Sequence, residues 1–169
     1  MDNRRAYLSY RSYLMRTVAL ITFQWLLLAT AFGQVPVAWV TNTNVVVEGD
    51  NTLRKNFSSG WNAETSTANI IPAGAAGWIE TVITEANKSR MLGLSDGDAG
   101  IDYFAIDYNI YFKNNVVGYV YEYGLIRHTL GAYTTGDVFS IERLGTEIRY
   151  IKNGATLYTS LVSSTQALV

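Results

Sequence analysis

The sequence predicts an all-β fold, a β-sandwich of two antiparallel sheets, behind a short apolar helix at the N-terminus. After residue 35, no stretch of ten or more residues places apolar side chains at helical spacing. Alternating, β-branched or aromatic runs recur about every ten residues, and Gly, Asn, Asp and Ser separate them. One open sheet of so many strands would expose large apolar faces, so we expect two sheets packed face to face.

Residues 1–33 have the pattern of a signal peptide. Four arginines precede an apolar run over residues 17–32, which is the order of a cationic n-region and an apolar h-region. Small side chains favour cleavage after Ala31 or after Gly33. The alternative is an uncleaved anchor, although the run is shorter than the roughly 20 residues that span a bilayer and contains Gln24. We therefore expect a secreted or cell-surface protein that has no membrane contact once the signal is removed.

The domain that follows, residues 34–169, has a composition that excludes several functions. The chain has 13 Lys and Arg residues and 14 Asp and Glu residues, of which four basic and one acidic lie in the signal segment. The domain therefore carries nine basic and thirteen acidic side chains, which leaves no basic footprint for nucleic acid. Because the chain has no Cys and a single His, disulfide frameworks, thiol nucleophiles and zinc fingers are excluded.

Each expected strand is an alternating or β-branched run that ends at turn residues. The expected strands are residues 37–41, 44–48, 52–56, 68–71, 77–84, 90–95, 103–113, 116–122, 126–134, 138–143, 147–152 and 156–160. The clearest local pattern is a tight hairpin at Asn153-Gly154, two residues that tolerate positive φ. Segment 64–76 is small and polar, and we expect a loop that flanks a short strand.

An ordered series of short motifs resembles a known superfamily. The motifs are Gly60-Trp61-Asn62, MLGLS at 91–95, IDY at 106–108, VYEYG at 120–124, GAY at 131–133, GDVF at 136–139 and YIKNG at 150–154. In this order they resemble the concanavalin A-like lectin/glucanase jelly rolls of bacterial secreted and surface proteins, in their SPRY-like variety. The resemblance implies a sandwich of two curved sheets that commonly serves as a carbohydrate- or protein-binding module, and it implies no activity.

The resemblance also bears on the end of the chain. Comparable domains usually continue past the hairpin with one or two strands that close the sandwich. Here, either that closing strand is missing or residues 166–169 supply a short version of it. A sheet edge left open would be prone to pair with another chain.

Glycosidases of this superfamily need two carboxylates that face one cleft. The Glu-x-Asp-x-x-Glu run of the glucanases does not occur in the sequence. Glu80 and Glu85 lie at odd spacing, which places them on opposite faces of a strand, and Glu142 and Glu147 flank a turn. Glu122 has aromatic neighbours but no evident partner. We expect no enzymatic activity, and a small glycoside hydrolase or polysaccharide lyase is the less favoured alternative.

The acidic loop at residues 96–102 is the most metal-like stretch of the sequence. Asp96, Asp98 and Asp102 alternate with small residues, and such oxygen ligands can bind Ca²⁺. The loop departs from the EF-hand pattern, because Gly100 stands where a third ligand belongs. The alternative is an ordinary turn whose Asp side chains cap backbone amides. No other cofactor is implied.

Aromatic side chains are the remaining evidence for a ligand, because flat rings stack on sugars while polar groups bind the hydroxyls. The candidate ligand-binding residues are Trp61, Asn62, Glu122, Tyr123, Arg127 and Tyr133. The three rings of this set lie in or near expected loops, and we expect them to meet. The alternative for each ring is a place in the core.

These observations favour a secreted, non-catalytic module that recognises a glycan or a glycosylated surface. The expected partner is a carbohydrate or a cell-surface glycoconjugate. The rival hypothesis is a structural or protein-interaction domain of a larger adhesin or extracellular repeat protein, whose partners would be other protein domains.

Overall fold

The computed structural model describes residues 34–49, 51–56, 59–97, 100 and 102–169, so the predicted signal segment lies outside the described residues. The chain divides into two compact units, residues 1–34 and 35–169, and every described strand belongs to the second. Within the described ranges, no helix has the length and hydropathy that crossing a membrane requires. The strands are β1 (Trp39–Thr43), β2 (Val45–Glu48), β3 (Thr52–Lys55), β4 (Glu64–Thr67), β5 (Gly77–Val82), β6 (Arg90–Leu94), β7 (Tyr108–Lys113), β8 (Val117–Glu122), β9 (Leu125–Ala132), β10 (Val138–Leu144), β11 (Glu147–Lys152) and β12 (Ala155–Thr159), and the 3₁₀ turn η1 (Tyr103–Ala105) precedes β7.

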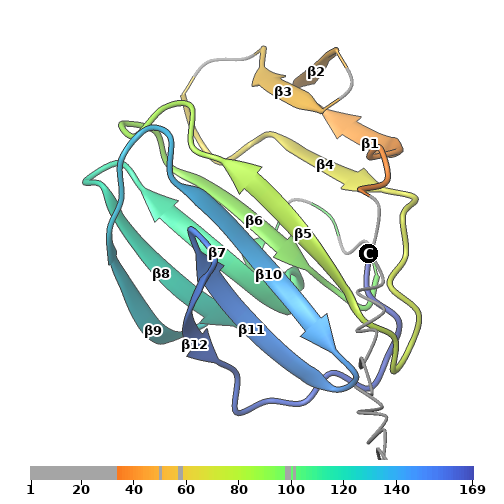
Figure 1. Ribbon diagram of the computed structural model, residues 1–169. Coiled ribbons are helices and arrows are strands. Elements are labelled where there is room, and N and C mark those ends of the chain that lie inside the picture. The colour runs from red at the N-terminus through yellow and green to blue at the C-terminus, as the bar shows by residue number, and fades with distance from the viewer. Residues whose placement is uncertain (1–33, 50, 57–58, 98–99, 101) are drawn as a thin grey trace, which may run out of the picture. The chain divides into compact units, whose positions relative to one another are not determined.

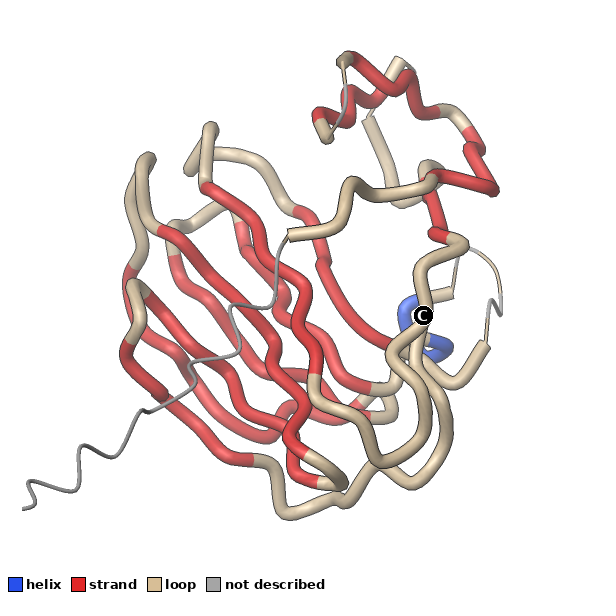
Figure 2. The backbone as a smooth tube through the Cα atoms, turned by 45° about the vertical axis from the view of Figure 1, so that its right-hand side comes forward, coloured by secondary structure: helices blue, strands red, loops and turns tan. Residues whose placement is uncertain are grey.

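Eight strands form two four-stranded antiparallel sheets that lie in two layers (Figures 1 and 2). The β10 sheet has the order β12-β11-β10-β5, and the β7 sheet has the order β6-β7-β8-β9. At the two edges, β5 lies beside β6 and β12 lies beside β9. The remaining strands form two small pairs, β1 with β4 and β2 with β3. The prediction of an all-β fold is confirmed, and the arrangement is consistent with a β-sandwich.

The core lies between the two large sheets and follows from the alternation of side chains along each strand. Phe112 of β7 packs against Phe139 of β10, with 5.0 Å between the ring centroids. The buried hydrophobic residues are Ile83, Leu94, Tyr108, Ile110, Phe112, Val120, Leu130, Tyr133, Phe139, Ile141, Ile148, Tyr150 and Leu168. Because these residues occupy one face of each sheet, the side chains between them in sequence point outward.

Two of the strand predictions were wrong. A strand was expected at residues 68–71, but β4 lies earlier, at Glu64–Thr67, where a loop was expected. This small, polar segment is extended because it pairs with β1, and the Thr65 hydroxyl donates to Oδ1 of Asn42 at 2.8 Å. The second error is at Tyr103–Ala105, which forms η1 instead of the start of β7.

The last residues of the chain close one edge of the sandwich. Leu168 pairs with Ile71, which precedes β5, through backbone hydrogen bonds of 2.8 and 2.9 Å. Val169 pairs in the same way with Ser95, which follows β6.

Arg143 on β10 holds this closing segment in place. Its side chain is fully buried, and its guanidinium donates to three backbone carbonyls, those of Gly145 at 2.7 Å, Gln166 at 2.5 Å and Ser164 at 3.2 Å. Hydrogen bonds that involve a charged group are stronger than neutral ones. One side chain therefore joins the β10–β11 turn to the end of the chain.

We predict that Arg143→Met lowers the free energy of unfolding by about 3 kcal/mol, because Arg143 donates three hydrogen bonds from a charged group, each worth about 1 kcal/mol or more. Arg149→Met is the matched control, since Arg149 is partly exposed and forms surface ion pairs with Glu142 and Glu147 that contribute less than about 1 kcal/mol. Urea unfolding of the two variants measures the difference. Equal effects would contradict this role of Arg143.

The predicted hairpin at Asn153-Gly154 is confirmed, since both residues have positive φ, 49° and 80°. Asn153 also links the hairpin to the turn before β10, because its side chain donates to Oδ1 of Asp137 at 2.8 Å and accepts from the Val138 amide. Lys152 lies 2.9 Å from the other Asp137 oxygen. The Asn153 hydrogen bond, and after it the Lys152 and Thr134 hydrogen bonds, hold the pKa of Asp137 well below its ordinary value.

Because the pKa of Asp137 is lowered in the folded protein, its carboxylate stabilises the fold at pH values above 3.8, the ordinary pKa of the group. This contribution is lost as the pH falls toward the folded-state pKa. We predict that Asp137→Asn lowers the melting temperature at neutral pH, and that the difference from the parent shrinks below about pH 4. Thermal unfolding followed by circular dichroism across this range measures it. A difference that stays constant with pH would contradict the ionic role of Asp137.

Candidate functional site

A connected group of aromatic rings covers the outer face of the β7 sheet. Tyr111 of β7 and Tyr119 and Tyr121 of β8 alternate with buried neighbours, and each is half-buried on the outer side. Trp61, from the segment between β3 and β4, and two residues of η1 join them. We call Trp61, Tyr103, Phe104, Tyr111, Tyr119 and Tyr121 the aromatic face.

Neighbouring rings of the aromatic face contact one another in a row across the β7 sheet. The Tyr111 ring is central, with centroid distances of 5.6 Å to Trp61, 5.8 Å to Tyr121 and 6.4 Å to Tyr119. Tyr121 lies 6.3 Å from Tyr103, which lies 4.1 Å from Phe104. The register between β7 and β8 brings the three tyrosines together, because Tyr111 lies directly opposite Tyr119 and diagonal to Tyr121.

Several of these rings remain accessible to solvent. The exposed fraction is 60% for Trp61, 55% for Phe104 and 39% for Tyr103. Single exposed hydrophobic residues are normal on a protein, but a contiguous group of large ones marks an interaction site. The aromatic face is therefore the surface of the described domain that is best suited to a ligand.

Two glycines allow η1 to lie against the β7 sheet. A Cβ atom at Gly124 would lie 2.0 Å from a ring atom of Phe104, and one at Gly93 would lie 2.1 Å from Ile106. Gly124 also has a φ of +76°, which other residues rarely adopt. Asp102 begins the turn, since its carboxylate accepts a hydrogen bond from the Phe104 amide at 3.1 Å. These contacts place Tyr103 and Phe104 beside the tyrosines of the strands.

The aromatic face presents uncharged rings and phenol hydroxyls. The pKa of Tyr121 is raised, first by burial and then by the neighbouring Tyr111, Tyr103 and Tyr119. Its hydroxyl therefore stays protonated and can donate a hydrogen bond. The face can thus offer ring surfaces for stacking and hydroxyl groups for hydrogen bonding.

The structure places Trp61 and Asn62 at one end of the aromatic face. The Asn62 backbone carbonyl accepts a hydrogen bond from the Asn44 side chain at 2.6 Å. The Asn62 side-chain oxygen is buried and makes no hydrogen bond with any residue that the structure describes. Of the residues predicted to bind a ligand, Trp61 contacts the aromatic face directly.

Three other predicted site residues, Glu122, Tyr123 and Arg127, lie together at the end of the sandwich, where Glu122 is buried while Tyr123 and Arg127 are exposed. Glu122 is fully buried and accepts a hydrogen bond from the Tyr150 hydroxyl at 3.1 Å, while Arg127 lies 3.7 Å from its second oxygen. The Tyr123 hydroxyl donates to that of Tyr108 at 3.3 Å. Burial, and after it the Glu122 charge, raises the pKa of Tyr150. The Tyr150 phenol therefore stays protonated. Its hydrogen bond to the buried Glu122 joins β8 to β11.

The expectation that Trp61, Tyr123 and Tyr133 meet was wrong. Tyr133 is only 1% exposed, and its ring packs against Phe112 and Phe139 in the core. Its amide bonds the Val116 carbonyl at 3.0 Å, so the pairing of β8 with β9 continues to Tyr133 and turns its ring inward. Its hydroxyl donates to the Lys113 carbonyl at 2.7 Å.

The acidic loop was the predicted calcium site. The Asp102 side chain caps η1, and the Asp96 amide donates to the carboxylate of Asp107 at 2.9 Å. Burial raises the pKa of Asp107. Asp98 lies outside the described residues, and no cluster of three or more His, Asp or Glu suited to a metal occurs in the described part of the chain.

The sequence did not point to most of the aromatic face, although a signal was present. Tyr119 and Tyr121 alternate on one strand, and Tyr111 lies on the strand before it at hairpin distance. That pattern predicts three rings on one face once the register is known. The structure exposes Phe104 beside Tyr103.

Comparison of the chain with protein-family models, with curated proteins and with solved structures finds no significant match. The resemblance to concanavalin A-like domains therefore stays a prediction from the residues. The function is argued from the aromatic face itself.

Proposed function

We propose that residues 34–169 form a non-catalytic glycan-binding domain of a secreted or cell-surface protein, and that the aromatic face is its binding surface. The observation that carries the proposal is the continuous row of partly exposed rings on one face of the β7 sheet. Aromatic rings stack on the apolar faces of sugars, and phenol hydroxyls exchange hydrogen bonds with sugar hydroxyls. The rigid strands below the rings hold them in place before the ligand arrives.

The inclination of the rings favours a soluble glycan over a crystalline one. The interplanar angle is 64° between Trp61 and Tyr111, 75° between Tyr111 and Tyr121, and 88° between Tyr121 and Tyr103. A flat crystalline surface needs coplanar rings. Steeply inclined rings instead suit a single twisted polysaccharide chain, whose sugars present faces in different directions.

We also propose that the sandwich is of the concanavalin A-like, SPRY-like jelly-roll type. Two facing four-stranded antiparallel sheets support this assignment. A second support is the contact between Asp137 and Asn153, because the Gly-Asp and Asn-Gly motifs that carry the resemblance meet there. In such modules a lone domain binds weakly, in the micromolar to millimolar range, and gains strength from multivalency.

A protein-interaction domain is the second candidate. Ile126 of β9 is more than half exposed and lies opposite Tyr121, so the aromatic face continues into an exposed aliphatic side chain. Protein interfaces use such mixed apolar surfaces. A glycan does not need this aliphatic side chain, so its contribution to binding separates the two candidates.

We predict that the full-length chain binds soluble polysaccharides on a glycan array, and that Trp61→Ala weakens the binding at least about tenfold, equivalent to about 1.4 kcal/mol. Ile126→Ser is expected to leave glycan affinity within about twofold. Leu161→Ala is the matched control, because it removes an exposed apolar side chain from another part of the domain.

Isothermal titration calorimetry with the best glycan from the array measures these affinities, and thermal unfolding checks that each variant is folded. The proposal would be abandoned if no glycan binds, or if Trp61→Ala binds as tightly as the parent. A large loss of binding in Ile126→Ser together with no effect of Trp61→Ala would favour the protein-interaction candidate.

A further inference from the structure

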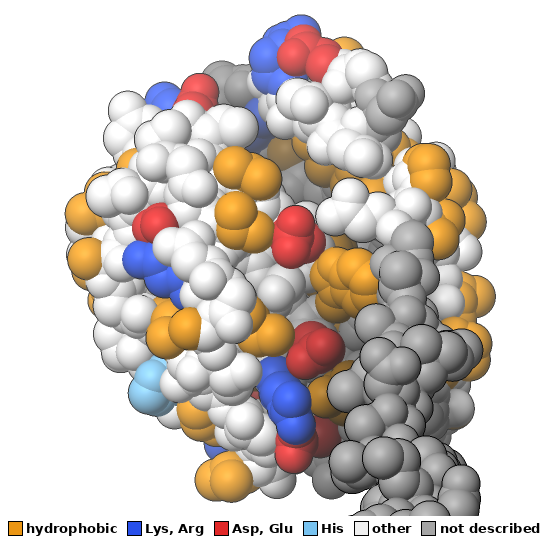
Figure 3. Space-filling model, viewed as in Figure 1, with side chains coloured by type: hydrophobic (Ala, Val, Ile, Leu, Met, Phe, Trp, Pro, Cys, Tyr) orange, Lys and Arg blue, Asp and Glu red, His pale blue; other side chains and the backbone are white. Residues whose placement is uncertain are grey.

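A hollow of about 310 Å³ lies on the outer face of the β10 sheet, the sheet that does not carry the aromatic face. We call it the acidic groove. In Figure 3, which views this face, acidic and hydrophobic side chains gather around it. Its lining residues are Trp78, Glu80, Val138, Ser140, Glu142, Ile151 and Gly154.

Two carboxylates line the groove from neighbouring strands. Glu80 of β5 lies opposite Ser140, and Glu142 of β10 lies opposite Trp78, so the two glutamates are diagonal neighbours. Diagonal residues on one face of an antiparallel pair have their Cα atoms about 7–8 Å apart. Both side chains point outward, because Ile79 and Ile141 between them point into the core.

The charge of the groove is only partly neutralised. Arg149 lies 4.0 Å from Glu142, but it also pairs with Glu147. Glu80 is exposed and forms no ion pair with any residue that the structure describes. The groove and its rim therefore carry three carboxylates against one guanidinium, which favours a cationic ligand.

Ser140 provides an independent indication of a ligand at this position. Its side chain lines the groove between the two glutamates, yet the residue is only 8% exposed. Its hydroxyl has no hydrogen-bond partner within the described residues, and because it is not one of their fully buried unpartnered atoms, it is open to the groove. A ligand group that enters the groove can supply that partner.

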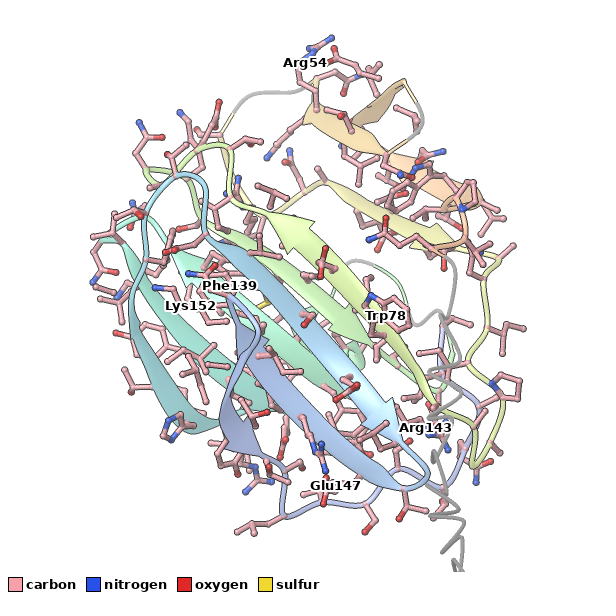
Figure 4. All side chains as sticks on the ribbon, viewed as in Figure 1. Arg54, Trp78, Phe139, Arg143, Glu147 and Lys152 are labelled. Atoms are coloured by element: carbon pink, nitrogen blue, oxygen red, sulfur yellow. The ribbon has the colours of Figure 1, made fainter. Side chains whose placement is uncertain are left out.

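Trp78 forms an apolar side of the groove next to these polar groups. It lies on β5, on the outer face turned toward the viewer in Figure 4. An indole ring both stacks on sugars and attracts a cation that lies within about 6 Å of its face. The groove thus combines an aromatic side, two carboxylates and a hydroxyl group.

We propose that the acidic groove is a second sugar site, and that it binds an amino sugar with a free ammonium group. The Glu80 and Glu142 carboxylates hold the ammonium, the Ser140 hydroxyl bonds a ring hydroxyl, and Trp78 contacts the sugar face. That the ligand is a sugar rests on the proposed function. That it is cationic rests on the charges of the groove alone.

The test uses the full-length chain and calorimetric titration with a glucosamine hexasaccharide, at a pH where its amines are charged. The N-acetylated hexasaccharide is the matched ligand without charge, and we expect it to bind at least tenfold more weakly. Glu80→Gln and Glu142→Gln are each expected to lower the affinity for the amino sugar at least tenfold. Glu85→Gln, which removes an exposed carboxylate outside the groove, is expected to leave it unchanged.

Four results would overturn the proposal. These are equal binding of the acetylated ligand, parent-like binding by both glutamine variants, binding of a lysine-rich peptide without binding of the amino sugar, and shortening of the hexasaccharide that the glutamine variants abolish. The last result would identify a catalytic pair of carboxylates.

Trp61→Ala separates this proposal from the proposed function, because Trp61 belongs to the aromatic face. We expect it to lose the neutral glycan and to keep the amino sugar. If neutral glycans fail to bind while the amino sugar binds, only the aromatic face is refuted as a site. If the reverse is observed, only the acidic groove is refuted.

Discussion

The packing of the β7 sheet against the β10 sheet is the constraint on which the other features depend. Phe112 and Phe139 meet between the sheets, and the buried aliphatic residues extend that contact along both layers. Because successive side chains of a strand point to opposite sides, burying one set presents the other set to solvent. Tyr111 and Tyr121 are therefore on the outer face of one sheet for the same reason that Glu80 and Glu142 are on the outer face of the other.

Polar groups hold the ends of this sandwich, in a chain that has no cysteine to do so. Arg143 joins the β10–β11 turn to the end of the chain, and Glu122 joins β8 to β11 through Tyr150. Buried charges are costly unless they are hydrogen-bonded. Arg143 donates three hydrogen bonds, and Glu122 accepts one from Tyr150 and has Arg127 3.7 Å from its second oxygen. These directional contacts fix which strands lie opposite one another more specifically than apolar contacts do.

The sequence was sufficient for the features that depend on neighbours along the chain. Alternation predicted the long strands, and Asn153-Gly154 predicted its hairpin, because both follow from local backbone preferences. Trp61 was placed correctly in a segment outside the strands. Local preference did not predict β4, whose small polar residues are extended only because β1 lies beside them.

The features that the sequence missed depend on register between strands. Tyr111 and Tyr121 become neighbours through the pairing of β7 with β8, and Glu80 and Glu142 through the pairing of β5 with β10. Counting residues along one strand says nothing about the pairing of Glu80 with Glu142. Both surfaces that we propose as sites are therefore products of sheet pairing.

The central claim is that the inner rings are buried and the outer rings are free to bind. Hydroxyl-radical footprinting with mass spectrometry tests it most directly, because it measures the accessibility of each aromatic side chain. The account predicts rapid oxidation of Trp61 and Tyr103 in the free protein, slow oxidation of Phe112 and Tyr150, and protection of Trp61 and Tyr103 when a glycan is added. Equal oxidation of inner and outer rings, or no protection by a bound glycan, would contradict it.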